Sequence, residues 1–224
     1  MENENGRKSE AAAPADKRSE RTFLYTLARI TAVVTVRGPW RVRVIGHEKL
    51  TALKAPAIII ANHRSMMDPF IIGAYTPYEI RFLGKRELTK SRFGRMLFKG
   101  LHMIPVTRHE TDMTAMRACV KALKEGDVLC IFPEGTRCRD TLMEHIESGA
   151  ALIALRSGAP LVPVCIDRKM RFLRRTFAMV GDPIAYDDLK AQGISNETAE
   201  KLTERIRDTF FRLKDEIDRE KAKT

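Results

Sequence analysis

Residues 55–70 read APAIIIANHRSMMDPF, and this stretch indicates the class of fold. The apolar run at 55–61 is short and rich in β-branched isoleucine, which is typical of a strand buried on both faces. Asp68-Pro69 is a typical helix start, with Asp68 as the N-cap and Pro69 as the first helical residue. Residues 62–67 therefore lie between a buried strand and a helix, where α/β proteins place reactive groups.

Strand and helix patterns alternate along the rest of the chain. Further strands are predicted at 42–44, 80–83, 102–106, 128–132, 161–166 (interrupted by Pro163) and 177–180, and helices at 22–36, 113–123, 149–157 and 195–222. This alternation predicts an α/β fold with a mixed, largely parallel central sheet flanked by helices. Residues 1–20 are polar and charged and are predicted to form a disordered tail. Residues 21–224 are then one domain.

The N-terminal helix has two interpretations. Its residues 22–36 are apolar apart from Arg29. It either packs on the domain or lies in a bilayer interface with Arg29 reaching the headgroups, so residues 21–37 are a possible membrane-docking helix at the edge of the fold. A spanning helix needs about 20 mostly apolar residues. No stretch of the sequence meets that requirement, and none is predicted.

The charge balance points to an anionic partner. Lys and Arg number 40 against 29 Asp and Glu, for a net charge of +11. Basic residues concentrate at 81–108 and 168–175, which favours an anionic membrane surface, an acidic carrier or nucleic acid. No helix-turn-helix, zinc-finger or RNP-type pattern accompanies the charge, so nucleic acid is not expected as a partner. The four cysteines form no CxxC pair, so no metal site is predicted.

The first candidate constellation pairs His63 with Asp68. If the loop between them turns back, the carboxylate can accept a hydrogen bond from one imidazole nitrogen. That contact fixes the tautomer and leaves the other nitrogen as a general base. The alternative is structural, with Asp68 capping the helix and His63 an ordinary loop residue.

The second constellation is FPEGTR at 132–137, which follows another buried strand. Gly135 permits a tight turn, so Glu134 and Arg137 can both point into a cleft at that edge of the sheet. Arg137 could hold a phosphate, and Glu134 could orient Arg137 or a substrate hydroxyl. The alternative is an ion pair in a surface turn.

Together these motifs resemble those of the glycerolipid acyltransferases, and most closely the bacterial 1-acylglycerol-3-phosphate acyltransferases. The resemblance covers about residues 40–183. HxxxxD at 63–68 and FPEGTR come in the family's order, and FLGKREL at 82–88 with IPVTR at 104–108 resembles the block between them. APLVPV at 159–164 resembles the last block. Cys138 and Thr107 depart from the family, which usually has Ser and often has Asp at those positions.

The resemblance implies a role for each matching residue. His63 would be the base that removes the proton of the acceptor hydroxyl, and Asp68 would orient it. Pro163 would shape the wall near the acyl donor. The residues implied to bind the glycerol-phosphate part of the acceptor are Lys85, Arg108, Glu134, Gly135, Thr136 and Arg137.

The function implied is the transfer of a fatty acyl group from acyl-CoA or acyl carrier protein to the sn-2 hydroxyl of lysophosphatidic acid, which gives phosphatidic acid. The family transfers the group directly and needs no cofactor. The absence of a GxSxG motif agrees with this. Peripheral or monotopic attachment to the cytoplasmic face of the cell membrane is expected. Two alternatives stay open: another acceptor (glycerol-3-phosphate, a lysophospholipid or a lipoamino acid), or a non-catalytic anionic-lipid-binding protein.

Overall fold

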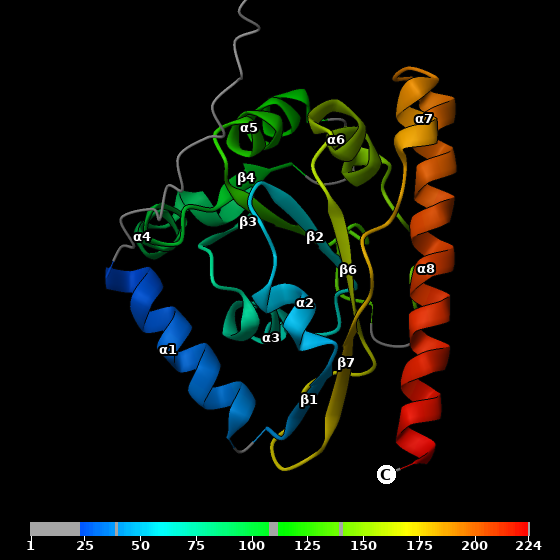
Figure 1. Cartoon of the computed structure of the whole chain (residues 1–224). Coiled ribbons are helices and arrows are strands. Elements are labelled where there is room, and N and C mark those ends of the chain that lie inside the picture. The colour runs from blue at the N-terminus through cyan, green and yellow to red at the C-terminus, as the bar shows by residue number, and fades with distance from the viewer. Residues whose placement is uncertain (1–22, 39, 108–111, 139–140, 224) are drawn as a thin grey trace, which may run out of the picture.

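The computed structural model describes residues 23–38, 40–107, 112–138 and 141–223, and it is built around a seven-stranded sheet (Figure 1). The strand order is β1-β7-β6-β2-β5-β3-β4. The strands are β1 (Val42–Ile45), β2 (Ala57–Ala61), β3 (Ile80–Lys85), β4 (Ile104–Val106), β5 (Val128–Ile131), β6 (Leu161–Ile166) and β7 (Thr176–Val180). The predicted tail at residues 1–20 lies outside the described residues.

Five neighbouring strands of this sheet are parallel. β6, β2, β5, β3 and β4 run in one direction, whereas β7 is antiparallel to β6 and parallel to β1. The prediction of a mixed, largely parallel sheet is therefore confirmed. The carboxyl ends of the five parallel strands meet at one edge, and the loops that follow them gather there.

The central strand β2 separates two apolar cores. Ile58 and Ile60 pack with the helices α5, α6, α7 and α8, and Ile59 packs with α1, α2 and α3 on the other face. All five residues of β2 are fully buried. The helices that cover the sheet are α1 (Phe23–Arg37), α2 (His47–Thr51), α3 (Asp68–Tyr75), α5 (Met113–Lys124), α6 (Gly149–Ser157), α7 (Asp187–Ala191) and α8 (Asn196–Ala222).

Pro163 lies within the interior strand β6, at the point where its ladder with β7 ends. Its carbonyl accepts a bond from Gly181 N at 2.9 Å, so its imide nitrogen faces the same side, where β7 has already ended at Val180. The predicted interruption of the strand at Pro163 is therefore wrong, because β6 is continuous from Leu161 to Ile166. A proline at the end of a ladder removes at most one hydrogen bond and leaves the pairing of β6 with β2 intact.

Four short elements were not predicted from the sequence. They are α2, α7, the 3-10 helix η1 (Arg86–Lys90) and α4 (Arg92–Gly100). Short helices depend on tertiary contacts more than on their own periodicity. The start of α3 also differs, because Met67 is the N-cap and Asp68 is already helical.

The helix α1 packs on the domain with one face and exposes apolar side chains on the other. Tyr25 and Val36 are buried, and the Tyr25 hydroxyl accepts a bond from Ile80 N at 3.0 Å. The exposed row is Phe23, Leu27, Ile30 and Val34. Within the part of the chain that the structure describes, no helix combines the length and apolar character that a membrane span requires.

Two adjacent phenylalanines of α8 test how this helix stabilises the sheet. Phe210 is fully buried in the core that contains β6, whereas Phe211 is 47% exposed. We expect Phe210→Ala to lower the free energy of unfolding by about 3–5 kcal/mol, because it leaves a cavity. Phe211→Ala should change it by less than about 0.5 kcal/mol. Urea unfolding of both variants measures the difference, and equal losses would contradict the assignment of α8 to the core.

Candidate active site

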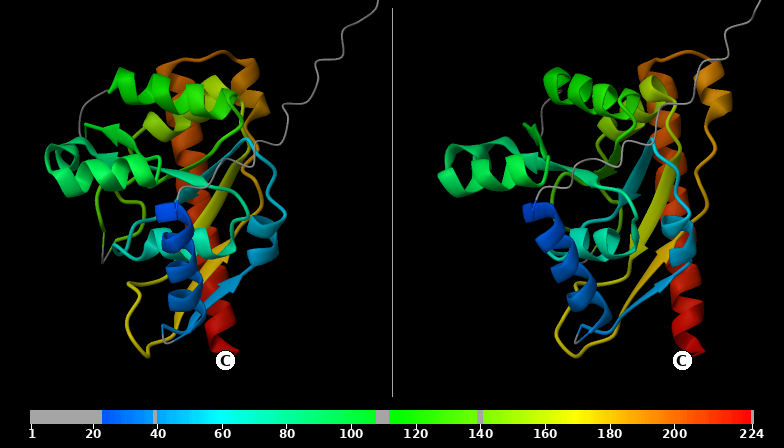
Figure 2. Two further views of the ribbon diagram at one scale, coloured as in Figure 1. Left: turned by 90° about the vertical axis from the view of Figure 1, so that its left-hand side faces the viewer. Right: turned by 60° about the vertical axis from the view of Figure 1, so that its left-hand side comes forward.

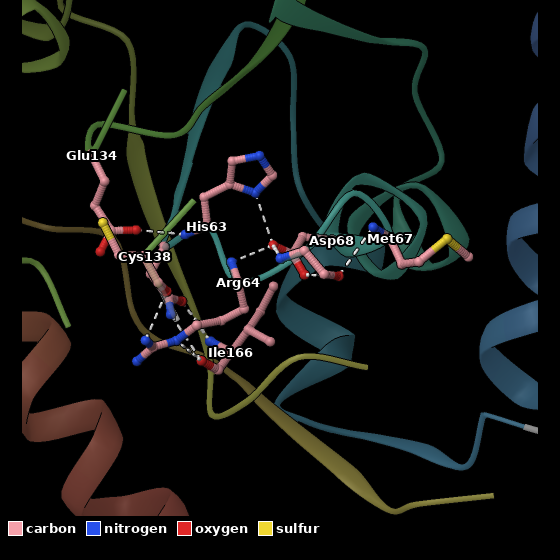
Figure 3. Close-up of polar contacts among 9 residues, drawn as sticks. His63, Arg64, Met67, Asp68, Glu134, Cys138 and Ile166 are labelled. Atoms are coloured by element: carbon pink, nitrogen blue, oxygen red, sulfur yellow. Dashed lines mark hydrogen bonds and ion pairs between the residues drawn. The ribbon is translucent and has the colours of Figure 1, made fainter. Parts of the chain in front are cut away.

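The loop between β2 and α3 brings His63 and Asp68 into contact, with Nδ1 of the imidazole 2.9 Å from Oδ2 of the carboxylate (Figure 3). Asp68 is fully buried. Its Oδ2 also accepts bonds from the backbone N–H groups of Arg64 at 2.6 Å and Ser65 at 2.7 Å. The carboxylate is therefore held by the loop before the helix, which explains why Asp68 does not cap it.

The contact with Asp68 decides the tautomer of His63. A carboxylate accepts hydrogen bonds, so Nδ1 carries the proton and Nε2 keeps a free lone pair. The ring of Phe132 stacks on the imidazole at a centroid distance of 4.3 Å and an angle of 26°. His63 also belongs to the wall of a large cavity. The loop between β2 and α3 therefore places an oriented imidazole, with Nε2 able to accept a proton, beside the cavity.

Glu134 connects the FPEGTR turn to the loop that carries His63. Its Oε2 accepts a bond from the backbone N–H of His63 at 2.6 Å, and its Oε1 accepts one from Met143 N at 3.0 Å. Burial raises the pKa of Glu134, and the two N–H bonds oppose that shift. Only 3% of the residue is exposed. The prediction that Glu134 points into a cleft beside Arg137 is therefore wrong: its carboxylate binds backbone.

Two further polar residues of the loop were missed as parts of the site. Arg64 is buried, and its Nη1 donates to the carbonyls of Cys138 at 3.0 Å and Thr141 at 2.6 Å. Asn62 exchanges two bonds with the backbone of Ile166, at 2.8 and 2.7 Å. These contacts tie the loops after β2, β5 and β6 together. A signal was available, since an arginine between a buried strand and a helix must find partners.

The substrate-binding residues predicted from the sequence occupy different places. Lys85, at the end of β3, and Gly135 both line the cavity. Gly135 has φ +63°, a conformation that favours glycine. Thr136 and Arg137 are exposed and are not part of the cavity wall.

Two other predicted residues do not join this site. Arg108 lies outside the described residues. Pro163 is buried inside β6 and takes no part in the cavity wall, so the prediction that it shapes this wall is not met there.

The cavity has a volume of about 1090 Å³ and an apolar wall. It lies between α1, α3, α4, α5, α6 and the sheet, and the exposed side chains Met66, Leu88 and Phe93 belong to its rim. Apolar residues deeper in the wall include Phe82, Leu97, Phe98, Met116 and Ile153. The cavity can therefore take up long apolar chains next to the imidazole, with the Lys85 ammonium beside them.

Known proteins resemble this chain in sequence. The model of the acyltransferase family matches residues 41–167, which contain both loops. The 1-acyl-sn-glycerol-3-phosphate acyltransferase of Bacillus subtilis (strain 168) is 27% identical over 195 residues, which cover 84% of this chain and 95% of that protein. The chloroplastic 1-acyl-sn-glycerol-3-phosphate acyltransferase LPAT1 of Arabidopsis thaliana is 23% identical over 65% of this chain and 41% of that longer protein.

A solved structure shares the fold. The crystal structure of the 1-acyl-sn-glycerophosphate (LPA) acyltransferase PlsC from Thermotoga maritima superposes with a TM-score of 0.64. The sequence identity is 24%, and the match covers 88% of this chain and 79% of that one.

The two backbone hydrogen bonds that Glu134 accepts can be tested by a substitution that changes one heavy atom. Glu134→Gln replaces an oxygen that accepts a backbone N–H with an amide that can only donate, so one buried N–H loses its partner. We expect the free energy of unfolding to fall by about 1–3 kcal/mol. The control is Glu144→Gln, at an exposed position about ten residues further along. Equal urea-unfolding curves for the two variants would contradict a stabilising role for the hydrogen bonds of Glu134.

Proposed function

The chain belongs to the acyltransferase family, and from this premise we propose that it acylates the sn-2 hydroxyl of 1-acylglycerol-3-phosphate to give phosphatidic acid for phospholipid synthesis. The donor in this proposal is a thioester, either acyl-CoA or acyl carrier protein. The observation that carries the proposal is the His63–Asp68 pair at the wall of an apolar cavity that Lys85 also lines. The names of the relatives from Bacillus subtilis and Arabidopsis thaliana support the choice of acceptor.

The chemistry follows from the tautomer of His63. Nε2 takes the proton of the acceptor hydroxyl while the hydroxyl oxygen attacks the carbonyl carbon of the thioester. The C–O bond forms, the C–S bond breaks, and the departing sulfur receives the proton from Nε2. Asp68 stabilises the imidazolium that exists between these steps, because its buried carboxylate stays bonded to Nδ1. No metal or cofactor takes part in this proposal.

Direct transfer also agrees with the state of the nearby thiol. Burial raises the pKa of Cys138, and the charge of Glu134 adds to that effect. A thiol of raised pKa is a weak nucleophile near neutral pH. The side chain is therefore unsuited to carry the acyl group as a covalent intermediate.

We further propose that the protein attaches to the cytoplasmic face of the membrane through α1. The row Phe23, Leu27, Ile30 and Val34 gives this helix an apolar outer face, as an interfacial helix requires. The exposed cavity-rim residues Leu88 and Phe93 give a lipid an apolar entrance. The basic residues of η1 and α4 would attract anionic headgroups; they are Arg86, Lys90, Arg92, Arg95 and Lys99.

The reaction is tested with purified protein, a panel of acceptors and both donor types. We expect the greatest turnover with lysophosphatidic acid, and a fall of kcat of at least about 10²-fold in His63→Ala, since a general base contributes that much. His47→Ala, a change of an exposed histidine on α2, should leave kcat unchanged. Unchanged turnover in His63→Ala would contradict the role of His63 as the general base. A lack of turnover with every acceptor would favour a lipid-binding protein.

The contact between Lys85 and the acceptor phosphate has its own test. Lys85 is exposed and has no hydrogen-bond or ion-pair partner among the described residues, so its ammonium is available to a ligand. We expect Lys85→Gln to raise the KM for lysophosphatidic acid roughly tenfold, the value of a charge-assisted hydrogen bond. Turnover of an uncharged monoacylglycerol should not change. Lys124→Gln, at an exposed position outside the cavity wall, is the matched control, and equal KM values for both variants would contradict the contact.

A further inference from the structure

The connection between β6 and β7 exposes two large apolar side chains at its tip. Phe172 is 61% exposed and Leu173 is 60% exposed. A bridge between Arg171 and Arg174 closes a tight turn around them. Leu173 has φ +58°, a conformation that favours glycine or asparagine. Two adjacent large apolar side chains that are exposed at one tip indicate a surface that meets an apolar partner.

Cations surround this tip. Lys169, Arg171, Arg174 and Arg175 are exposed and have no acidic partner among the residues that the structure describes. The exception in the segment is Arg168, whose guanidinium pairs with Asp167 at 2.9 Å. An apolar tip surrounded by cations is complementary to an anionic bilayer, which has charged headgroups at its surface and acyl chains beneath them.

The base of the turn is held firmly, so the tip is presented at a defined angle. Met170 points inward and is almost fully buried. Asp167 accepts a bond from Phe177 N at 3.0 Å and forms an ion pair with Lys221 of α8 at 2.7 Å. The residue before it, Ile166, is the one that Asn62 binds, so the tip is connected to the loop of His63 through backbone contacts.

The tip lies beside the C-terminal end of α1. The rings of Phe172 and Trp40 meet edge to face at a centroid distance of 5.7 Å, and Trp40 follows α1 closely in the chain. Figure 1 and both views of Figure 2 place the β6–β7 connection at that end of the helix. Tryptophan is favoured at the boundary between water and lipid. The tip is therefore a neighbour of the C-terminal end of α1, the end that carries Val34.

We propose that residues 168–175 form a second membrane anchor that docks on an anionic bilayer: Phe172 and Leu173 enter the boundary between headgroups and acyl chains, and the four cations contact lipid phosphates. This rests on the membrane attachment proposed above for α1. Two separate contacts fix the orientation of the protein, whereas a single interfacial helix allows rotation about its axis. The apolar tip favours a bilayer over an acidic carrier protein, which would need only the cations.

The chain carries its own probe for the test, because Trp40 is its only tryptophan. The full-length protein is mixed with vesicles of phosphatidylcholine and phosphatidylglycerol, with and without brominated acyl chains. We expect brominated lipid to quench Trp40 in the wild type and in Phe211→Ala, whose changed residue lies on α8. Quenching should weaken in the double variant Phe172→Ala/Leu173→Ala, because α1 alone holds Trp40 less deeply, and vesicle binding should be roughly tenfold weaker. Quenching equal to that of the wild type would overturn the anchor.

The charges are tested in a second variant, in which Lys169, Arg171, Arg174 and Arg175 become Gln. Its affinity for vesicles rich in phosphatidylglycerol should fall at least tenfold, since each cation near an anionic surface contributes roughly a fivefold factor. Unchanged affinity for these vesicles, with loss of binding to acyl carrier protein instead, would overturn the proposal in favour of a carrier site. A matched control replaces Lys190 and Lys201 on the far helices by Gln.

Measuring turnover both in detergent and on vesicles distinguishes a failure of the proposed anchor from a failure of the proposed reaction. Both variants should acylate lysophosphatidic acid dispersed in detergent at the wild-type rate, because the anchor lies outside the cavity wall, and should be slower only on vesicles. A wild-type protein inactive in both media would refute the reaction. Equal rates on vesicles for the variants and the wild type would refute the anchor alone.

Discussion

The buried carboxylate of Glu134 is the constraint on which the site depends. It accepts one backbone N–H from each of two loops, and these loops follow different strands of the sheet. Such bonds to a charged acceptor are short and strong in a buried setting. Glu134 accepts its bond from the backbone N–H of His63 and not from the imidazole. It therefore positions the residue and leaves both ring nitrogens available for other contacts. The ring is then oriented separately by Asp68.

The parallel sheet makes this arrangement possible. β2, β5 and β6 are neighbours and end at the same edge, so the loops after them are within reach of one another. Each loop is then bound to another by a buried polar side chain: Glu134, Arg64 and Asn62 act in this way. A buried charge is tolerated only where its partners are complete, and here the partners are backbone groups that the loops would otherwise leave unsatisfied.

The sequence predicted the elements whose pattern is local. The buried strands β2 and β5 follow from short continuous apolar runs, and the long helix α8 follows from its apolar periodicity. The contact between His63 and Asp68 follows from their spacing around one loop. The direction of the Glu134 side chain could not be predicted, because the donors that hold it lie 71 and 9 residues away. The helix α4 was missed for a similar reason, since a nine-residue amphipathic segment becomes a helix only where the domain supports it.

The same loops connect the site to the outer surface of the protein. Asn62, next to His63 in the chain, binds the backbone of Ile166, and the exposed β6–β7 turn begins one residue later. A lipid acceptor keeps its acyl chain in an apolar phase while its headgroup stays in water, so its hydroxyl lies near the boundary between the two. An enzyme for such a substrate must hold its base at that depth. In the membrane attachment proposed above, the bonds between Asn62 and Ile166 would fix the distance between the imidazole of His63 and the lipid surface more directly than a flexible linker would.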